Sequence, residues 1–209
     1  MTREATGWTL LAASYLLGSI PFGLLLGKRV AGVDVRQAGS GNIGATNVAR
    51  TAGKGLGVLT LLLDAAKGAL AVVATALLMG ERTDGAWATA AGLAAFLGHV
   101  FPPWLRFRGG KGVATAFGAF LVLDPRVGLA AAAVFGLAFL ATRTVSLASL
   151  AAALAVAGSA AVLRGGDDTV ARVAAAVMLV VVVRHQSNIR RILRGEESRV
   201  RRRPPGDGR

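Results

Sequence analysis

Several residue types that carry common enzyme chemistry are absent or scarce in this sequence. There is no cysteine, which excludes disulfide bonds, thiolate catalysis and cysteine-ligated metals. The two histidines, His99 and His185, are too few for an ordinary zinc site. Neither is followed by an aspartate five positions later, so the H-x-x-x-x-D motif of one acyltransferase class is missing. No acidic cluster is present to hold Mg²⁺, and we expect neither a metal nor another cofactor.

Negative charge is also scarce, with 11 acidic residues against 24 lysines and arginines and a net charge of +13. Such an excess can indicate nucleic-acid binding. Basic loops that face anionic lipid headgroups explain it better in a chain this apolar. We therefore expect membrane lipids, and no nucleic acid, as partners.

Long apolar runs dominate the chain, which is 54% hydrophobic with a mean hydropathy of +0.57. The runs that are nearly free of charge are 8–27, 56–80, 86–104, 113–141, 147–163 and 170–183. A helix of about 20 residues crosses a bilayer core of about 30 Å. The charged Asp124-Pro125-Arg126 step would be costly inside a membrane, so it divides 113–141 into two spans. The sequence predicts an all-α integral membrane protein, a bundle of about seven transmembrane helices.

The basic residues are distributed unevenly over such a bundle. With seven spans, 18 of the 24 fall in the first, third and fifth loops and in the C-terminal tail. The positive-inside tendency makes this face cytoplasmic, with the N-terminus outside and the C-terminus in the cytoplasm. We expect a multi-pass protein of the bacterial cytoplasmic (inner) membrane whose active site lies on the cytoplasmic face.

The first of three polar clusters on this face runs from Gly39 to Arg50. Its glycines permit positive φ and close approach of a phosphate to backbone amides. The residues of this cluster that offer amides, hydroxyls or charge are Ser40, Gly41, Asn42, Gly44, Thr46, Asn47 and Arg50. An ordinary polar turn with a helix cap is the alternative, but nine such residues in succession favour a phosphate-binding loop. The spacing of a nucleotide P-loop is absent.

The second cluster is Gly109-Gly110-Lys111-Gly112, followed by an apolar run that we expect to begin a helix. A helix N-terminus next to an ammonium is a favourable seat for a phosphate. The alternative is a lysine that merely extends to lipid headgroups. Flanking glycines are unnecessary for that, so the pattern favours a binding site.

The third cluster spans 185–197. His185, Asn188 and Arg191 are three residues apart and share a helix face, and Glu197 follows. Ser146 and Ser149 add hydroxyls near the fifth loop. Three polar clusters on one membrane face predict one active site assembled from loops, whereas His99 is expected to be structural.

Asp64 and Lys67 are the charged residues inside a predicted span. Their i, i+3 spacing allows an ion pair. The pair either braces the bundle below the site or contacts a ligand directly.

These motifs, in this order, resemble the bacterial PlsY family of acyl-phosphate:glycerol-3-phosphate acyltransferases. The resemblance covers nearly the whole chain, through segments 18–23, 32–34, 40–50, 63–68, 98–102, 109–115, 145–149 and 185–197. It implies a seven-helix inner-membrane enzyme that transfers an acyl group from acyl phosphate to glycerol 3-phosphate. The products are 1-acylglycerol 3-phosphate (lysophosphatidate) and phosphate, the first step of phospholipid biosynthesis, with no acyl-CoA and no metal. Residues 1–197 form the membrane acyltransferase domain, and we expect 198–209 to be a disordered basic tail.

The resemblance also assigns roles to residues. The acyl phosphate is assigned to Ser40, Gly41, Asn42, Gly44, Thr46 and Asn47. Glycerol 3-phosphate is assigned to Arg50, Lys111, Ser149, His185 and Asn188. The catalytic set is Ser40, Arg50, Lys111, His185 and Asn188. The supporting set is Asp64, Lys67, Gly109, Gly110, Gly112, Ser146, Arg191 and Glu197.

Two questions stay open at this level. The proton of the attacking hydroxyl goes either to His185 as general base or to the departing phosphate, with His185 only positioning the substrate. A transporter of a phosphorylated solute is the alternative function, although one-sided polar clusters and the lack of paired repeats argue against it. The partners expected are acyl phosphate, glycerol 3-phosphate and lipids, with a functional link to an acyl-phosphate synthase.

Overall fold

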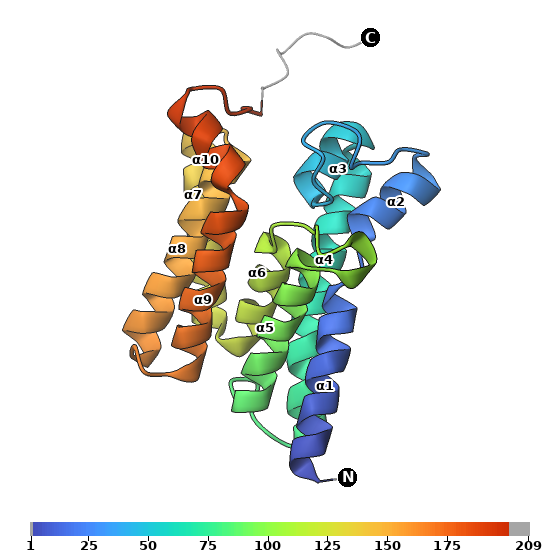
Figure 1. Ribbon diagram of the computed structural model, residues 1–209. Coiled ribbons are helices and arrows are strands. Elements are labelled where there is room, and N and C mark those ends of the chain that lie inside the picture. Colours follow the sequence, from blue (N-terminus) through green and yellow to red (C-terminus); the bar gives the residue numbers. More distant parts are fainter. Residues whose placement is uncertain (1, 201–209) are drawn as a thin grey trace.

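The computed structural model describes residues 2–200, in which all regular secondary structure is helical and no strand is present (Figure 1). The helices are α1 (Arg3–Gly18), α2 (Phe22–Val30), α3 (Ala45–Thr51), α4 (Lys54–Met79), α5 (Ala86–Val100), η1 (Pro103–Leu105), α6 (Val113–Leu123), α7 (Pro125–Thr142), α8 (Val145–Arg164), α9 (Thr169–Arg184) and α10 (Gln186–Leu193). The expected tail at 201–209 lies outside the described residues.

The predicted apolar segments correspond in order to α1, α4, α5, α6, α7, α8 and α9. Four stretches of residues 2–200 are long and apolar enough to cross a membrane: 3–30, 54–79, 125–142 and 145–164. A fifth is reached if α9 and α10, which meet at a bend of 60°, count as one span. The all-helical membrane architecture agrees with the prediction, while the number of seven spans and their sidedness stay predictions.

The first apolar segment, expected as one helix over 8–27, is broken. Helix α1 ends at Gly18 and α2 begins at Phe22, because Pro21 between them lacks an N–H and its ring crowds the preceding turn. The Ser19 hydroxyl donates to the Leu16 carbonyl at 2.7 Å, which satisfies part of the broken turn. The break sets α2 off the axis of α1, where α2 contacts α4 and α3 (Figure 1).

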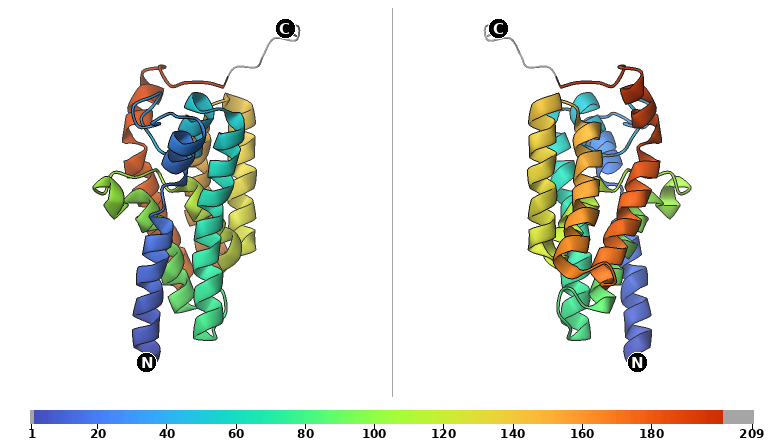
Figure 2. Two further views of the ribbon diagram at one scale, coloured as in Figure 1. Left: turned by 90° about the vertical axis from the view of Figure 1, so that its right-hand side faces the viewer. Right: turned by 90° about the vertical axis from the view of Figure 1, so that its left-hand side faces the viewer.

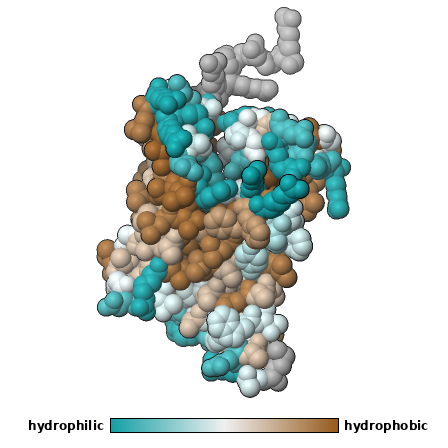
Figure 3. Space-filling model, viewed as in Figure 1, coloured by the Kyte–Doolittle hydropathy of each residue, from teal (hydrophilic) through white to brown (hydrophobic). Residues whose placement is uncertain are grey.

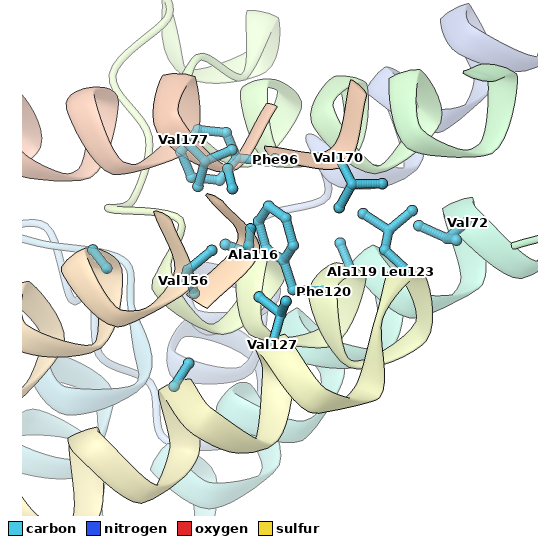
Figure 4. Packing of buried hydrophobic residues seen from close by; sticks show 14 of the residues in the cluster. Val72, Phe96, Ala116, Ala119, Phe120, Leu123, Val127, Val156, Val170 and Val177 are labelled. Atoms are coloured by element: carbon cyan, nitrogen blue, oxygen red, sulfur yellow. The ribbon is translucent and has the colours of Figure 1, made fainter. Parts of the chain in front are cut away.

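The helices pack around a continuous apolar core formed by α4 to α9. Phe96 and Phe120 are its largest fully buried apolar side chains, surrounded by valines and alanines (Figure 4). Small residues let the helices approach closely, as membrane bundles require. Gly118, for example, leaves no room for a Cβ, which would lie 1.9 Å from the Ala65 carbonyl oxygen of α4.

Helix α6 has only 11 residues, and its N-terminus lies below the level of α3 and α10 (Figures 1 and 2). The end of the preceding loop, residues 109–112, is therefore packed within the bundle, whereas residues 104–108 project from its side (Figure 2). Pro102 and Pro103 help to end α5 at Val100, and Gly112, with φ of 80°, starts α6. The second polar cluster is thus carried deeper than the other two.

Hydrophobic residues form a broad band across the middle of the molecule, and hydrophilic residues gather at its two ends (Figure 3). At the end of the bundle opposite α3 and α10, the Arg164 guanidinium donates to carboxylates from three loops that connect helices. These partners are Asp84 at 3.1 Å, Asp124 at 3.3 Å and Asp168 at 2.9 Å. The predicted break at 124–126 is present, with Pro125 as the first residue of α7.

Candidate active site

The first loop, residues 36–44, is organised by the buried amide of Asn47. Its nitrogen donates to the carbonyls of Val35, Ala38 and Asn42 at 2.8, 3.1 and 2.9 Å. Its oxygen accepts from the Ser40 N–H at 2.8 Å. The amide of Asn47 is thereby occupied by the loop itself, so Asn47 shapes the loop from inside.

Two of the three glycines expected to use positive φ do so. Gly39 has φ of 61° and Gly41 of 70°, whereas Gly44 has an ordinary φ of −78° and caps α3. The Asn42 side chain accepts from the Gly44 N–H at 2.8 Å, and this turn explains the extended backbone at Gly44. Ser40, Thr46 and Arg50 are exposed and available to a ligand.

The backbone of the second loop is hydrogen-bonded to the end of α5 and to the Arg184 side chain of α9. Gly109 and Gly110 donate their N–H groups to the carbonyls of Val100 and His99 at 3.1 Å each. The Arg184 guanidinium donates to their carbonyls, at 2.9 Å to Gly109 and 3.3 Å to Gly110. Neither glycine could carry a Cβ, because it would meet His99 at 2.1 and 2.0 Å. These glycines are therefore required by close packing, which fixes the backbone before Lys111.

Lys111 connects the second cluster to the third. Its ammonium donates to the Asn188 side-chain oxygen at 2.6 Å, and the Asn188 amide nitrogen donates to Glu197 at 2.6 Å. Burial lowers the pKa of Lys111 to about 8; the Glu197 carboxylate opposes the shift, and guanidiniums reinforce it. Arg50 is one of those guanidiniums, which puts the first cluster within electrostatic reach of Lys111.

Glu197 gathers the C-terminal part of the site. It accepts hydrogen bonds from Ser146 at 2.7 Å, from Asn188 at 2.6 Å and from Arg191 at 2.6 Å. Burial opposes ionisation of Glu197, but these donors outweigh it and hold its pKa below the ordinary value. The Val200 N–H donates to the Arg143 carbonyl at 2.8 Å. Residues 195–200 thus form a strap across the ends of α7 and α8.

His185 is buried at the junction of α9 and α10. Its Nδ1 lies 2.8 Å from the Val181 carbonyl oxygen. A carbonyl can only accept, so Nδ1 carries the proton and Nε2 is left as an acceptor. Ser149 is also buried, and its hydroxyl donates to the Val145 carbonyl at 2.9 Å.

A cavity of about 730 Å³ separates the first loop from the second. The first loop contributes Ser40, Gly41 and Asn42, and Gly109 lies on the other side. Four arginines also line it, namely Arg36, Arg106, Arg108 and Arg184, and none of the lining residues is acidic. The cavity is suited to an anion. Lys111, Asn188 and His185 are not among its lining residues.

Asp64 and Lys67 form a buried ion pair of 2.8 Å, as their spacing predicts. His99 completes the group, with Nδ1 at 2.8 Å from the Lys67 ammonium. These contacts are those expected of a pair that braces the bundle. Within residues 2–200, no three histidine, aspartate or glutamate side chains gather to hold a metal ion.

Comparison with known sequences identifies the family. The family model described as "Glycerol-3-phosphate acyltransferase" matches residues 8–195. The chain belongs to this family. A glycerol-3-phosphate acyltransferase of Anaeromyxobacter sp. strain Fw109-5 is 51% identical over 202 residues, 96% of this chain and 100% of that protein. The acyltransferase of Myxococcus xanthus strain DK1622 is 48% identical over 190 residues, 91% and 97% of the two chains.

Solved structures agree. Two crystal structures of PlsY (YgiH), an integral membrane glycerol 3-phosphate acyltransferase, match with TM-scores of 0.87 and 0.85 at 40% and 39% identity. Each match covers 94% of this chain and 96% of that chain; one is a glycerol 3-phosphate form and the other a lysophosphatidic acid form. The predicted PlsY resemblance is confirmed: the chain is an integral membrane glycerol-3-phosphate acyltransferase, an enzyme of phospholipid biosynthesis.

Sequence reasoning missed two residues that shape the site of this acyltransferase. Arg184 entered the sequence analysis only as one of the basic residues after the last predicted span, 170–183, although it directly precedes His185, the first residue of the third cluster. His99 was expected to be structural, and its contacts with Lys67 and Gly110 are of that kind; the sequence did not indicate which residues it contacts. No spacing in the sequence connects His99 to either residue.

Proposed function

We propose that this acyltransferase takes its acyl group from acyl phosphate and produces 1-acylglycerol 3-phosphate and inorganic phosphate. One observation carries the proposal: two glycine-rich, cation-bearing loops face each other across one anion-suited cavity. In acyl phosphate the leaving phosphate is bonded directly to the reacting carbonyl group. Such a donor therefore needs a second phosphate seat immediately beside that of glycerol 3-phosphate.

The first loop is the proposed seat of the donor phosphate. The exposed hydroxyls of Ser40 and Thr46 and the backbone around Gly41 and Gly44 offer hydrogen bonds, with Arg50 at the end of α3 supplying charge. Asn42 and Asn47 hold this loop in shape through their side-chain bonds to its backbone. A preorganised loop loses little entropy when the phosphate binds.

The seat of glycerol 3-phosphate is proposed outside the lining of that cavity, at Lys111, Arg50 and Asn188, with Ser149 and His185 on the helices beside it. The Lys111 ammonium is oriented by Asn188 and lies above the N-terminus of α6, where the helix dipole favours an anion. Ser146, Arg191 and Glu197 support Asn188 from behind.

In the proposed reaction, a hydroxyl oxygen of glycerol 3-phosphate attacks the acyl carbonyl carbon. The new ester bond forms, the bond from that carbon to the phosphate oxygen breaks, and the hydroxyl proton ends on the departing phosphate. The acylating group is already activated, so alignment and charge stabilisation supply most of the catalysis. His185, with Nε2 free to accept, only positions glycerol 3-phosphate and takes no proton from it.

The proposal includes the membrane arrangement expected from the charges. Seven spans would cross the inner membrane, with the N-terminus outside and the three clusters on the cytoplasmic side. The acyltransferase domain would comprise 1–197. A soluble acyl-phosphate synthase would then be able to supply the donor at the same membrane surface.

The deciding experiment offers the purified protein glycerol 3-phosphate with either palmitoyl phosphate or palmitoyl-CoA. Release of phosphate and formation of lysophosphatidate are measured, with Lys111→Ala as the control. Product from palmitoyl phosphate alone, lost in the variant, is expected. Product from palmitoyl-CoA alone would overturn the proposed donor and leave the acyltransferase assignment intact.

A further inference from the structure

The reaction proposed above makes no use of the charged network buried at the centre of the bundle. The Lys67 ammonium lies 2.8 Å from the Asp64 carboxylate and 2.8 Å from His99 Nδ1, and donates to the Ile20 carbonyl at 3.0 Å. The ammonium thus forms hydrogen bonds with two other parts of the chain and an ion pair with Asp64 on its own helix, α4. Lys67 and Asp64 are 2% exposed and His99 is 5% exposed.

The network reaches the second loop through His99. An ammonium has no lone pair, so Nδ1 of His99 accepts from Lys67 and the ring proton resides on Nε2. That Nε2 edge faces Gly110, where a Cβ would lie 2.0 Å from Nε2. His99 also accepts the Gly110 N–H through its own carbonyl at 3.1 Å. The residue before Lys111 therefore rests directly on His99.

The network reaches the first loop through Ile20, in the break between α1 and α2. The Ile20 carbonyl accepts from the Lys67 ammonium at 3.0 Å and from the Phe22 N–H at 3.1 Å, and the ammonium lies 5.6 Å from the Phe22 ring centroid. Helix α2 then packs under the first loop: a Cβ on Gly23 would lie 2.0 Å from the Ile43 carbonyl oxygen. Leu24, Val35, Ile43 and Val48 close this contact as a small apolar cluster.

We propose that Lys67, with Asp64 and His99, is a positioning network that sets the first and second loops at the separation the two phosphates require. The inference rests on the proposed function, which assigns one phosphate to each loop. A buried ion pair adds little net stability, and apolar residues of similar volume often replace it without loss. What the network supplies is geometry, because a single ammonium on α4 is bonded both to the break between α1 and α2 and to His99 on α5.

A merely structural network and a positioning network differ in their kinetics. Loss of stability alone lowers the amount of folded enzyme and leaves KM unchanged. Displacement of a loop weakens binding of the substrate that this loop holds and so raises the KM for that substrate. Misplacement of the reacting atoms by about 1 Å lowers the rate as well, by up to about 100-fold.

His99→Asn separates the two contacts of His99. Asparagine places its amide oxygen at the position of Nδ1, so it keeps the acceptor for Lys67 and removes the ring edge that supports Gly110. We expect kcat/KM for glycerol 3-phosphate to fall roughly 10- to 100-fold through KM, with KM for the acyl donor unchanged. Thr60→Val is the control for stability, because it removes a buried hydroxyl on α4 one turn before Asp64.

The paired change Asp64→Asn with Lys67→Met removes the ion pair without leaving a single buried charge. Because this change also removes the hydrogen bond to the Ile20 carbonyl, KM is expected to rise for both substrates.

A double-mutant cycle then tests the contact between His99 and Gly110. Gly110→Ala should be severely impaired by its clash with His99, and His99→Ala combined with Gly110→Ala should recover at least part of the loss.

Binding of glycerol 3-phosphate by calorimetry, without any donor, gives the decisive readout. Weaker binding by His99→Asn than by Thr60→Val, at equal unfolding temperature, supports the network. Unchanged binding, or a His99→Ala/Gly110→Ala double variant no better than Gly110→Ala, would overturn it. Failure of the wild type to use acyl phosphate would contradict the donor assignment only, since this binding measurement does not depend on it.

Discussion

The ammonium of Lys111 donates a 2.6 Å hydrogen bond to the side-chain oxygen of Asn188, 77 residues further along the chain. The same amide donates through its nitrogen to Glu197. The cation on one side and the carboxylate on the other fix the orientation of the Asn188 amide. This chain of contacts joins the loop before α6 to α10 and to the C-terminal strap.

Asn188→Asp should lower kcat/KM for glycerol 3-phosphate by roughly 100-fold, a loss of the size seen for well-placed charged groups in active sites. The new carboxylate neutralises Lys111, repels the substrate phosphate and lies against Glu197. Steady-state kinetics with glycerol 3-phosphate as the varied substrate measure the effect. Gln186→Glu adds the same charge to an exposed position of α10 and is the control. Equal losses in the two variants would contradict a specific role for Asn188.

The pH dependence of the enzyme should report the ionisation of Lys111. Burial lowers its pKa to about 8, so the charged form that attracts phosphate predominates below that pH and is lost above it. We expect kcat/KM for glycerol 3-phosphate to fall as the pH rises through about 8. Bound phosphate favours the ammonium, so the corresponding fall in kcat should lie at higher pH.

Glu197→Gln provides a directional check on that profile. The Glu197 carboxylate raises the pKa of Lys111, so its removal should move the alkaline fall in kcat/KM to lower pH. Lys111→Arg should abolish the fall, because a guanidinium stays charged over this range. A profile that is the same in all three enzymes would assign the ionisation to another group.

The C-terminal strap should depend on the same glutamate. Glu197→Gln replaces an acceptor of three hydrogen bonds, from Ser146, Asn188 and Arg191, by a neutral amide that cannot receive them all. We expect loss of most activity and faster proteolysis after Arg194. The neighbouring Glu196 is exposed, so Glu196→Gln is the matched control and should behave as wild type.

Arg164 should stabilise the fold from the opposite end, far from the site. Its bonds to Asp84, Asp124 and Asp168 connect three loops, and Arg164 is the main reason that the pKa of Asp168 is low. Arg164→Gln should destabilise the protein by roughly 1.5–3 kcal/mol, the range for hydrogen bonds to charged groups. Thermal unfolding in detergent measures this, and Arg172→Gln at an exposed position of α9 serves as control. A change in KM with unaltered unfolding would contradict a purely stabilising role.

The helical segments were predictable because apolar runs with charged or proline-containing breaks are a local signal. The helix start after Gly112 and the break at Pro125 follow from residues at those positions. The break at Pro21 was missed because the apolar run continues on both sides of it. The Ile20 carbonyl at this break accepts from Lys67, which lies 47 residues further along the chain, and hydropathy carries no information about such a contact.

Within the site, residue types indicated which segments bind anions but not which side chains face the ligand. Asn47 illustrates the difference, since its amide is turned inwards to four groups of its own loop. Composition cannot distinguish an amide that binds phosphate from an amide that only shapes the phosphate-binding loop. The same holds for Arg184, whose target is a pair of backbone carbonyls in a distant loop.

The role of His185 can be decided by two substitutions that treat its ring nitrogens separately. Glutamine at 185 places an amide near the position of Nε2, where it can still orient the substrate hydroxyl but cannot take its proton. Asparagine instead replaces Nδ1, which donates to Val181 and has no part in the proposed contact with substrate. If His185 only positions glycerol 3-phosphate, His185→Gln should retain appreciable kcat, and His185→Asn should lose more. A kcat for His185→Gln below the background of Lys111→Ala would sink the positioning role, because general bases contribute roughly 100- to 10,000-fold. Single-turnover measurements with acyl phosphate make the comparison free of product release, so that the difference between the two variants reports the chemical step alone.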